Sequence, residues 1–386
     1  MKILTATAAV AIFSITALTP SSLTKTDRAA THAAKEQKIQ VAILLDVSGS
    51  MEGLIEQAKA QLWNMVNVMG RSKCENGNPK IEIALYEYGR STNDSKAGYV
   101  KQISGFTSDL DLLSQELFKL TTNGGDEYCG HVIHTSLGEL NWDTVALSYK
   151  VIFIAGNEDF LQGNIHYTQS CAEAKKKGVI VNTIYCGDKM QGIREHWNLG
   201  GECGNGSFTN INQDAKIEEI PTPYDSTLVV LNYKLNGTYL YYGANGYSDF
   251  NKQGEVDKMN SAMSKSAGLK RATAKSNSLL YQNAGWDLID ATKNDSTGNF
   301  ISTLDKKTLP DSLKNKSKEE LQKVIDKKAA ERSAIQKEII NLSTQRNAYI
   351  VTERAKNATA AKTATLETEV EKIIKEQVKR FNMKVD

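Results

Sequence analysis

The sequence QVAILLDVSGSM, residues 40–51, joins an apolar run to a turn rich in hydroxyl groups. Its first part, residues 40–45, is almost continuously apolar and is bounded by polar residues, which is typical of a parallel strand covered on both faces. From Leu54 to Met69 the apolar residues recur at helical spacing. The segment therefore predicts a buried strand, a tight turn and an amphipathic helix in direct succession.

The same alternation of patterns continues to about residue 218. Apolar runs predict further strands, and amphipathic segments predict helices between them. The strands are expected at 81–88, 99–103, 150–155, 179–185 and 206–211, and the helices at 108–120, 130–140, 165–177 and 193–197. Such an alternation implies an α/β fold, a doubly wound and mostly parallel sheet with helices on both faces. We therefore predict a folded domain over residues 37–218.

Beyond residue 218 the strand patterns end. Residues 219–310 give an irregular, partly helical pattern, and the sequence predicts no particular fold for 236–300. Residues 311–386 are largely helical, but their heptad pattern is interrupted because Lys328, Arg332 and Arg346 occupy core positions. We therefore expect a helical hairpin that packs on itself or on the rest of the protein rather than a long intermolecular coiled coil, with self-association through these helices as the alternative.

The first 22 residues have the composition of a secretory signal peptide. Lys2 gives a positive start, residues 3–18 are apolar or small and uncharged, and Pro20 ends the run. The run is short for a membrane-spanning helix, which needs roughly 20 apolar positions. We predict a signal peptide at 1–22, a linker at 23–36 and an exported protein that is periplasmic, on the cell surface or secreted.

Charge and composition exclude several classes of function. The 386 residues include 47 Lys and Arg against 45 Asp and Glu, a net charge of +2. Such a balance gives no general attraction for nucleic acid, so no nucleic-acid partner is predicted. No Walker loop, dinucleotide fingerprint or EF-hand spacing occurs, and no small-molecule cofactor is predicted.

The cysteine content fits an exported chain. Its five cysteines, Cys74, Cys129, Cys171, Cys186 and Cys203, show no zinc-type spacing. An oxidising compartment permits disulfides among them. We expect one or two disulfides that involve Cys171, Cys186 and Cys203, in a connectivity that the spacing leaves open.

Asp46, Ser48 and Ser50 form a D-x-S-x-S motif where the first predicted strand ends. Ligands of open parallel sheets bind at the carboxyl ends of the strands, where the N-terminus of the next helix offers unpaired N–H groups. One carboxylate and two hydroxyls in a single turn are hard oxygen ligands that suit Mg²⁺ or Mn²⁺. Alternatively, these side chains only cap the turn and the helix that follows.

In this context ILLDVSGSM, residues 43–51, resembles the opening of the metal-ion-dependent adhesion site (MIDAS) of von Willebrand factor type A (vWA) domains. The order of predicted strands and helices follows the same family over about half of the chain. The resemblance implies a divalent-cation site used to bind protein or peptide ligands. It also implies that Asp46, Ser48 and Ser50 are metal ligands, with Asp46 acting through a water.

Other positions depart from the pattern of that family. The Gly-rich loop is expected to supply a threonine, for which Thr121 or Thr122 is the candidate, but Asp126 stands where that threonine usually follows the glycines. After the fourth strand of the family an aspartate is expected, and Gly156 occupies its position, followed by Asn157 and Glu158. We expect Asp126 with Asn157 or Glu158 to supply substitute oxygens in a modified site. The alternative is a degenerate site whose turns only hold the fold.

No enzyme is predicted. The G-x-S-x-G pattern of hydrolase nucleophiles is absent, and Cys129 with His131 or His134 fits an amphipathic helix better than a thiol and base pair. The sequence favours a protein of adhesion type that binds an acidic residue of a protein or peptide partner through its cation. Two alternatives remain, namely a metal-free scaffold of the cell envelope that assembles through its helical tail, and a hydrolase with an unrecognised site.

Overall fold

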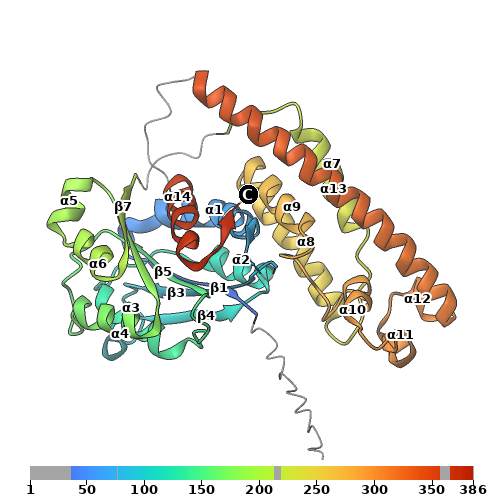
Figure 1. The fold of residues 1–386 in the computed structure, drawn as a ribbon, viewed down its shortest axis with the longest axis horizontal. Helices are drawn as coiled ribbons and strands as arrows, with labels where there is room; N and C mark the ends of the chain where they lie inside the picture. Colours follow the sequence, from blue (N-terminus) through green and yellow to red (C-terminus); the bar gives the residue numbers. More distant parts are fainter. Residues whose placement is uncertain (1–35, 76, 213–218, 357–365, 386) are drawn as a thin grey trace, which may run out of the picture. The chain divides into compact units, whose positions relative to one another are not determined.

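The computed structural model describes residues 36–75, 77–212, 219–356 and 366–385. The predicted signal peptide at 1–22 lies outside the described residues, as does all of the predicted linker except Glu36. In the described part of the chain, six strands form one sheet in the order β4-β3-β1-β5-β6-β7 (Figure 1). Their bounds are β1 Lys38–Asp46, β3 Lys80–Tyr88, β4 Lys101–Thr107, β5 Tyr149–Gly156, β6 Ile180–Cys186 and β7 Asn205–Ile211.

Strand β1 lies inside the sheet and pairs in parallel with β3 and β5. Strands β6 and β7 continue the parallel order on one side, and β4 runs antiparallel to β3 at the opposite edge. Asp46, the last residue of β1, is paired with Tyr88, the last residue of β3. The predicted doubly wound, mostly parallel sheet is confirmed, and the carboxyl ends of β1, β3 and β5 meet at one edge.

Side chains of β1 alternate between two hydrophobic cores, which explains its almost continuous apolar sequence. Ile39 and Val41 belong to one core, and Ala42 and Leu44 belong to the other. The first core lies under α1 (Glu52–Met69), α2 (Leu110–Lys119) and α14 (Leu366–Gln377), and the second under α3 (Cys129–Glu139), α4 (Tyr167–Lys177) and α6 (Trp197–Cys203). The short α5 (Lys189–Arg194) precedes α6.

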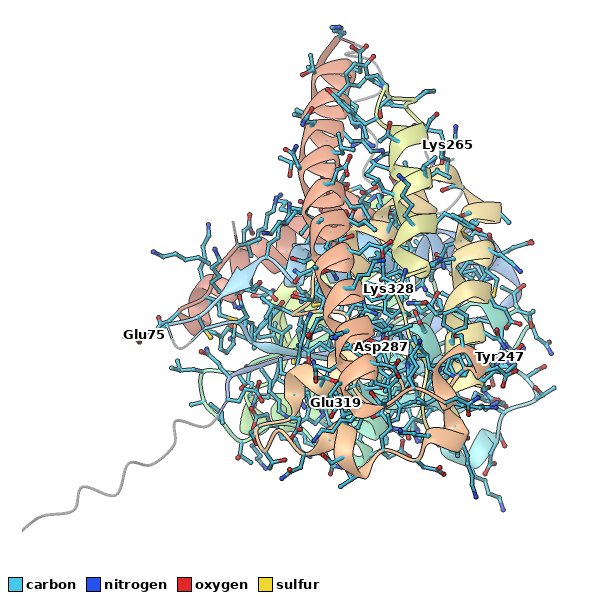
Figure 2. All side chains as sticks on the ribbon, turned by 90° about the vertical axis from the view of Figure 1, so that its right-hand side faces the viewer. Glu75, Tyr247, Lys265, Asp287, Glu319 and Lys328 are labelled. Atoms are coloured by element: carbon cyan, nitrogen blue, oxygen red, sulfur yellow. The ribbon has the colours of Figure 1, made fainter. Side chains whose placement is uncertain are left out.

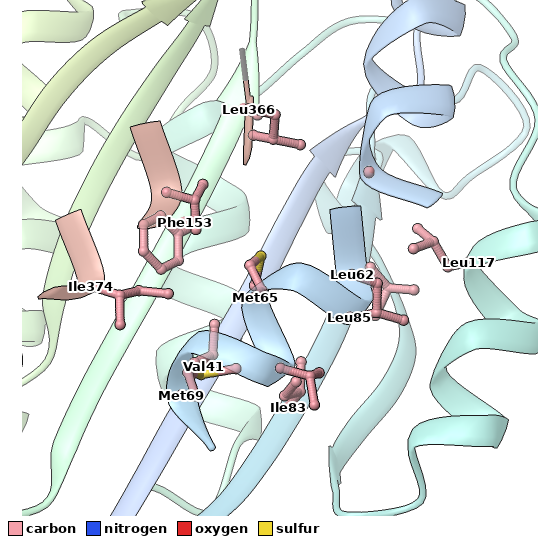
Figure 3. Close-up of a cluster of buried hydrophobic side chains, with 14 of the residues drawn as sticks. Val41, Leu62, Met65, Met69, Ile83, Leu85, Leu117, Phe153, Leu366 and Ile374 are labelled. Atoms are coloured by element: carbon pink, nitrogen blue, oxygen red, sulfur yellow. The ribbon is translucent and has the colours of Figure 1, made fainter. Parts of the chain in front are cut away.

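The last described segment of the chain returns to the sheet. The apolar side chains of α14 are buried in the first core, where Figure 3 shows Ile374 near Phe153 of β5. Gln377 is buried and accepts a hydrogen bond from the Tyr149 hydroxyl at 2.9 Å. After α14, β8 (Lys384–Val385) pairs antiparallel with β2 (Ser72–Lys73). The apolar stripe of α14 thus covers the sheet, so this helix of 311–386 packs on the rest of the protein.

Residues 219–356 form a helical region between β7 and α14. Its helices are α7 (Asp225–Asn236), α8 (Gly246–Met263), α9 (Lys265–Ser276), α10 (Leu288–Asn294), α11 (Phe300–Thr303), α12 (Asp311–Lys314) and α13 (Lys318–Lys356). Side-chain caps begin several of them; the Ser264 hydroxyl, for example, accepts from the Ala267 amide at the start of α9. The helix α13 spans 39 residues and packs against α7 and α9.

Two of the three basic residues that interrupt the heptad pattern of α13, Arg332 and Arg346, are buried with acidic partners, whereas the half-buried Lys328 pairs with Glu331 of the same helix at 2.9 Å. Arg332 contacts Asp287 at 2.7 Å, and Figure 2 shows Asp287 against α13. Arg346 contacts Asp225 of α7 at 2.9 Å. The interrupted stripe therefore reflects buried ion pairs within the helical region, since each guanidinium has a carboxylate on a neighbouring element.

A second buried network joins the helical region to the sheet domain. Arg271 of α9 contacts Asp111 of α2 at 2.6 Å and also pairs with Asp257 of α8. Its guanidinium lies 4.6 Å from the ring centroid of Trp63 on α1, whose indole N–H donates to Asn260 of α8 at 2.9 Å. Helices α8 and α9 are therefore anchored on α1 and α2 by polar as well as apolar contacts.

All five cysteines are free thiols in the structure, so none of the expected disulfides is formed. Cys129 belongs to one core and Cys186 to the other, and the sheet between them keeps these thiols apart. The Cys171 thiol of α4 donates to the Gly200 carbonyl of α6 at 3.8 Å. Among the helices that the structure describes, none combines the length and the apolar character needed to cross a membrane.

Candidate functional site

The D-x-S-x-S turn follows β1 and is fixed from both sides. The Val47 amide donates to the Tyr88 carbonyl at 3.0 Å, and the Val47 carbonyl accepts from the Asn123 amide at 2.8 Å. Asp46 is fully buried, and its Oδ1 accepts from the Ser48 amide at 2.7 Å. Its second oxygen, Oδ2, is buried without a hydrogen-bond partner among the described residues. The turn thus holds one uncommitted carboxylate oxygen at the carboxyl edge of the sheet.

Hydroxyl and amide groups extend the site from Asp46 toward the loop after β5. The Ser48 and Ser50 hydroxyl oxygens lie 3.4 Å apart. Ser50 Oγ also lies 3.4 Å from Asn157 Oδ1 and 3.3 Å from Asn157 Nδ2. The structure therefore brings together four residues that the sequence proposes as ligands, Asp46, Ser48, Ser50 and Asn157.

Glu127, which the sequence analysis does not single out, is the second carboxylate of the site. It precedes α3 and is only 6% exposed. A Cβ atom on Gly89 would lie 2.9 Å from Glu127 Cγ and 3.0 Å from Asp46 Oδ1, and Gly89 adopts a left-handed φ of +82°. The missing side chain at Gly89 therefore leaves the space in which the Asp46 and Glu127 carboxyls lie close together.

The remaining predicted ligands lie around this centre. Glu158 is half-buried, and its carboxylate accepts a hydrogen bond from the Gln162 side chain at 3.4 Å. Its backbone carbonyl accepts a hydrogen bond from the Trp197 indole at 2.7 Å, which fixes the backbone at this residue. Asp126 is exposed, and its carboxylate accepts from the Tyr128 hydroxyl at 3.4 Å. Thr122 is half-buried in the loop that adjoins the turn, and within the described residues it makes no hydrogen bond to the turn.

Burial and like charges raise the pKa values of both central carboxyls. Burial raises the pKa of Asp46 to about 6, and the negative charge of Glu158 adds to the rise, whereas hydrogen bonds from Ser48 oppose it. Burial, together with the charges of Asp46, Glu158 and Asp126, raises the pKa of Glu127 to about 8. The nearby Arg90 is committed to Glu87 at 2.9 Å. Within the described part of the chain these two carboxyls therefore lack a positively charged partner, which a bound cation would provide.

Gly156 stands at the position of the family aspartate because no side chain fits there. A Cβ atom on Gly156 would lie 2.5 Å from the Tyr88 hydroxyl oxygen and 2.9 Å from Asp46 Oδ2. The Tyr88 hydroxyl donates to the Ala155 carbonyl at 3.0 Å and occupies this space. The loop after β5 therefore reaches the site only through the residues beyond Gly156, namely Asn157 and Glu158.

The donors present fit a hard divalent cation. In the described part of the chain no group of three or more His, Cys, Asp or Glu side chains is arranged to hold a metal ion. A cation here would depend on hydroxyl, amide and water oxygens beside the carboxylates of Asp46 and Glu127, an all-oxygen set of the kind that Mg²⁺ and Mn²⁺ accept. The buried, unpaired Asp46 Oδ2 is the atom that such a cation would satisfy.

The thiol considered for catalysis lies in the core. Cys129 is fully buried, and its polar contact is the Tyr88 hydroxyl at 3.8 Å. Burial raises the pKa of the Cys129 thiol well above its usual value, which disfavours the reactive thiolate. His134 pairs with Glu173 of α4 at 2.8 Å.

No protein-family model matches the chain, and no curated protein matches its sequence. Similar solved structures include the SpRpn10 VWA domain, with 15% identity, 46% of this chain and 90% of that chain covered, and a TM-score of 0.35. Proximal thread matrix protein 1 from the mussel byssus, with a zinc-occupied MIDAS motif, has 15% identity and a TM-score of 0.33, and the match covers 45% of this chain and 42% of that chain. The pilus adhesin SpaC from Lactobacillus rhamnosus GG has 14% identity and a TM-score of 0.34, and the match covers 47% of this chain and 28% of that chain. Because these identities and scores are low, the resemblance of this chain to vWA domains rests on its own strand order and its D-x-S-x-S turn.

Proposed function

We propose that this chain is an exported, non-enzymatic binding protein whose sheet domain holds a divalent cation and uses it to bind a protein or peptide partner. The observation that carries the proposal is Asp46 Oδ2, which is buried, lacks a hydrogen-bond partner in the described structure and lies at the carboxyl edge of the sheet. Leaving such an oxygen unpaired costs about 1–3 kcal/mol, and a bound cation removes that cost.

The cation is held by Asp46, Ser48, Ser50 and Glu127, with Asn157 and Glu158 beside them. It supplies a positive charge that offsets the buried carboxylates and a coordination position for an external ligand. An aspartate or glutamate of the partner would complete the shell at the coordination position that the residues of the chain leave open.

Calorimetric titration of the mature protein with Mg²⁺ and with Mn²⁺, after treatment with a chelator, tests the proposal. We expect saturable binding by the wild type and its loss in Asp46→Asn, which keeps the shape of the side chain but removes its charge. We expect Glu127→Gln to weaken binding at least tenfold, because a carboxylate next to Asp46 is lost.

Glu202→Gln is the control, since Glu202 is exposed on α6 and its charge is not among those that shift the pKa of Asp46 or Glu127. It should bind the cation within about twofold of the wild type, a change of roughly 0.4 kcal/mol. Equal affinities of the wild type and Asp46→Asn would contradict the proposed site. Partners are then sought among acidic peptides with and without the cation, and binding that survives the chelator would contradict the proposed mode of recognition.

A further inference from the structure

A cavity of about 360 Å³ lies between helices α1, α9, α13 and α14. This volume is within the range of about 300–1,000 Å³ that small-molecule sites occupy. Four basic side chains (Arg71, Lys270, Arg346 and Arg354) and two acidic ones (Glu367 and Glu371) line it, together with hydroxyl, amide and aliphatic groups. It is separate from the turn at Asp46, and none of the lining residues belongs to the proposed cation site.

Arg346 is the side chain of this cavity that most clearly indicates a binding site. It is only 5% exposed, yet it lines the cavity. Its Nε donates to Asp225 Oδ1 at 2.9 Å, and that carboxylate is also bonded by the amide and the hydroxyl of Thr222. Among the described residues the hydrogen bond that Arg346 donates comes from Nε, and Nη1 and Nη2 donate none. These outer N–H groups are not among the fully buried polar atoms, so they can reach a ligand in the cavity that Arg346 lines.

The other charges of the cavity are largely matched within it. Lys270 contacts Glu367 at 2.6 Å and Gln61 at 2.9 Å. Arg71 lies 3.8 Å from Glu371. The acidic side chains are thus engaged by Lys270 and Arg71, and they are not available to the Nη atoms of Arg346.

The other residues that line the cavity suit the uncharged part of a ligand whose anionic group pairs with Arg346. The hydroxyl oxygens of Thr273 and Ser343 lie 2.7 Å apart, and Ser343 is 5% exposed. Leu269 and Ile340 add apolar surface from α9 and α13. A ligand of this cavity would place its charge on Arg346 and its uncharged part on these hydroxyl and aliphatic groups.

We propose that the cavity between α1, α9, α13 and α14 binds a small molecule that carries a carboxylate or a phosphate group, which pairs with Nη1 and Nη2 of Arg346. The planar fork of a guanidinium matches the two oxygens of such groups, so the pair is bidentate. This site is independent of the cation site and goes beyond the proposed function.

The test uses inorganic phosphate and succinate as probes, titrated into the chelator-treated full mature chain by calorimetry at constant ionic strength. We expect saturable binding of at least one probe. Arg346→Lys should weaken it at least tenfold, because the charge remains and the planar fork is lost. Asn347→Trp, at an exposed position that lines the cavity, should abolish binding by filling the space.

Gln345→Trp is the control, because Gln345 is exposed on the same helix and does not line the cavity. It should bind the probes as the wild type does. Binding of phosphate alone or of succinate alone would assign the group that the site takes. Absence of saturable binding by both probes, or equal binding by Asn347→Trp and the wild type, would overturn the proposal. Asp46→Asn should leave probe binding unchanged, which separates this result from a failure of the cation site.

Discussion

The Tyr88 hydroxyl fills the space beside Asp46 that a side chain at position 156 would otherwise occupy. The hydroxyl of Tyr88 lies where a side chain at 156 would begin, and Asp46 Oδ2 lies on the far side of the same space. The absence of the family aspartate is therefore coupled to the presence of a tyrosine at the end of β3. In the proposed cation site, the second carboxylate comes instead from Glu127, in the loop before α3.

At the level of single residues, Gly156→Ala should lower the free energy of unfolding and weaken cation binding at the proposed site. Its methyl group would overlap the Tyr88 hydroxyl oxygen at 2.5 Å and crowd Asp46 Oδ2 at 2.9 Å. We expect a loss of about 1–3 kcal/mol in the free energy of unfolding, as in other overpacked cores. Urea unfolding of the variant measures it. The double variant Tyr88→Phe with Gly156→Ala should recover part of the loss, and a double variant no more stable than Gly156→Ala would contradict this account.

The sequence predicts some residues of the site and misses others for local reasons. Asp46, Ser48 and Ser50 lie in one tight turn, so their proximity follows from the motif alone. Glu127 depends on the path of a loop, which is set when the Ser91 amide donates to the Gly124 carbonyl at 2.9 Å. The sequence signal for Glu127 is weak, a glutamate two residues before α3, separated from it by Tyr128.

At the scale of elements, α14 shows why apolar periodicity alone does not assign a helix to a domain. Its stripe of apolar residues fits a hairpin with α13 as well as a cover for the sheet. The deciding partners lie on α1 and β5, far upstream in the chain. The buried arginines of α13 pose a similar problem, because their acidic partners Asp287 and Asp225 lie on other elements.

Truncation of one core side chain of α14 measures its place in the sheet domain. Ile374 is fully buried in the first core, and Ile374→Ala should lower the free energy of unfolding by about 2–5 kcal/mol. Glu376→Ala, at an exposed position of the same helix, should change it by less than about 0.5 kcal/mol. Urea denaturation followed by tryptophan fluorescence compares the two. Equal stability of the variants would mean that α14 is not part of the core.

At the scale of the whole molecule, the buried network around Arg271 ties the helical region to the sheet domain. Asp257 pairs with both Arg271 and Lys275, and Lys275 is itself fully buried. Despite the opposing effect of burial, the charges of Lys275 and Arg271 hold the pKa of Asp257 well below its usual value. Because the folded state binds this proton less tightly than the unfolded state, the ionised pair adds stability at neutral pH.

The pH dependence of unfolding tests this network. The contribution of Asp257 is present above the unfolded pKa of about 4 and is lost as the pH falls toward its lower folded value. We expect the free energy of unfolding to fall from pH 5 toward about pH 2, and to fall less steeply in Asp257→Asn. Asp326→Asn, at an exposed position of α13, should keep the wild-type slope. Identical slopes for Asp257→Asn and the wild type would contradict the assignment.

Because residues 366–385 pack on the sheet, the sheet domain can finish folding only after α14 has been synthesised. During synthesis β1 and α1 emerge early, but the helix that covers one face of their sheet emerges only after the whole helical region has been made. Until then the apolar side chains beneath α14, such as Met65 and Phe153, lack their cover. The sheet domain therefore closes last, at the carboxyl terminus, and a chain cut short before α14 would expose the interior of its first domain rather than lose a tail.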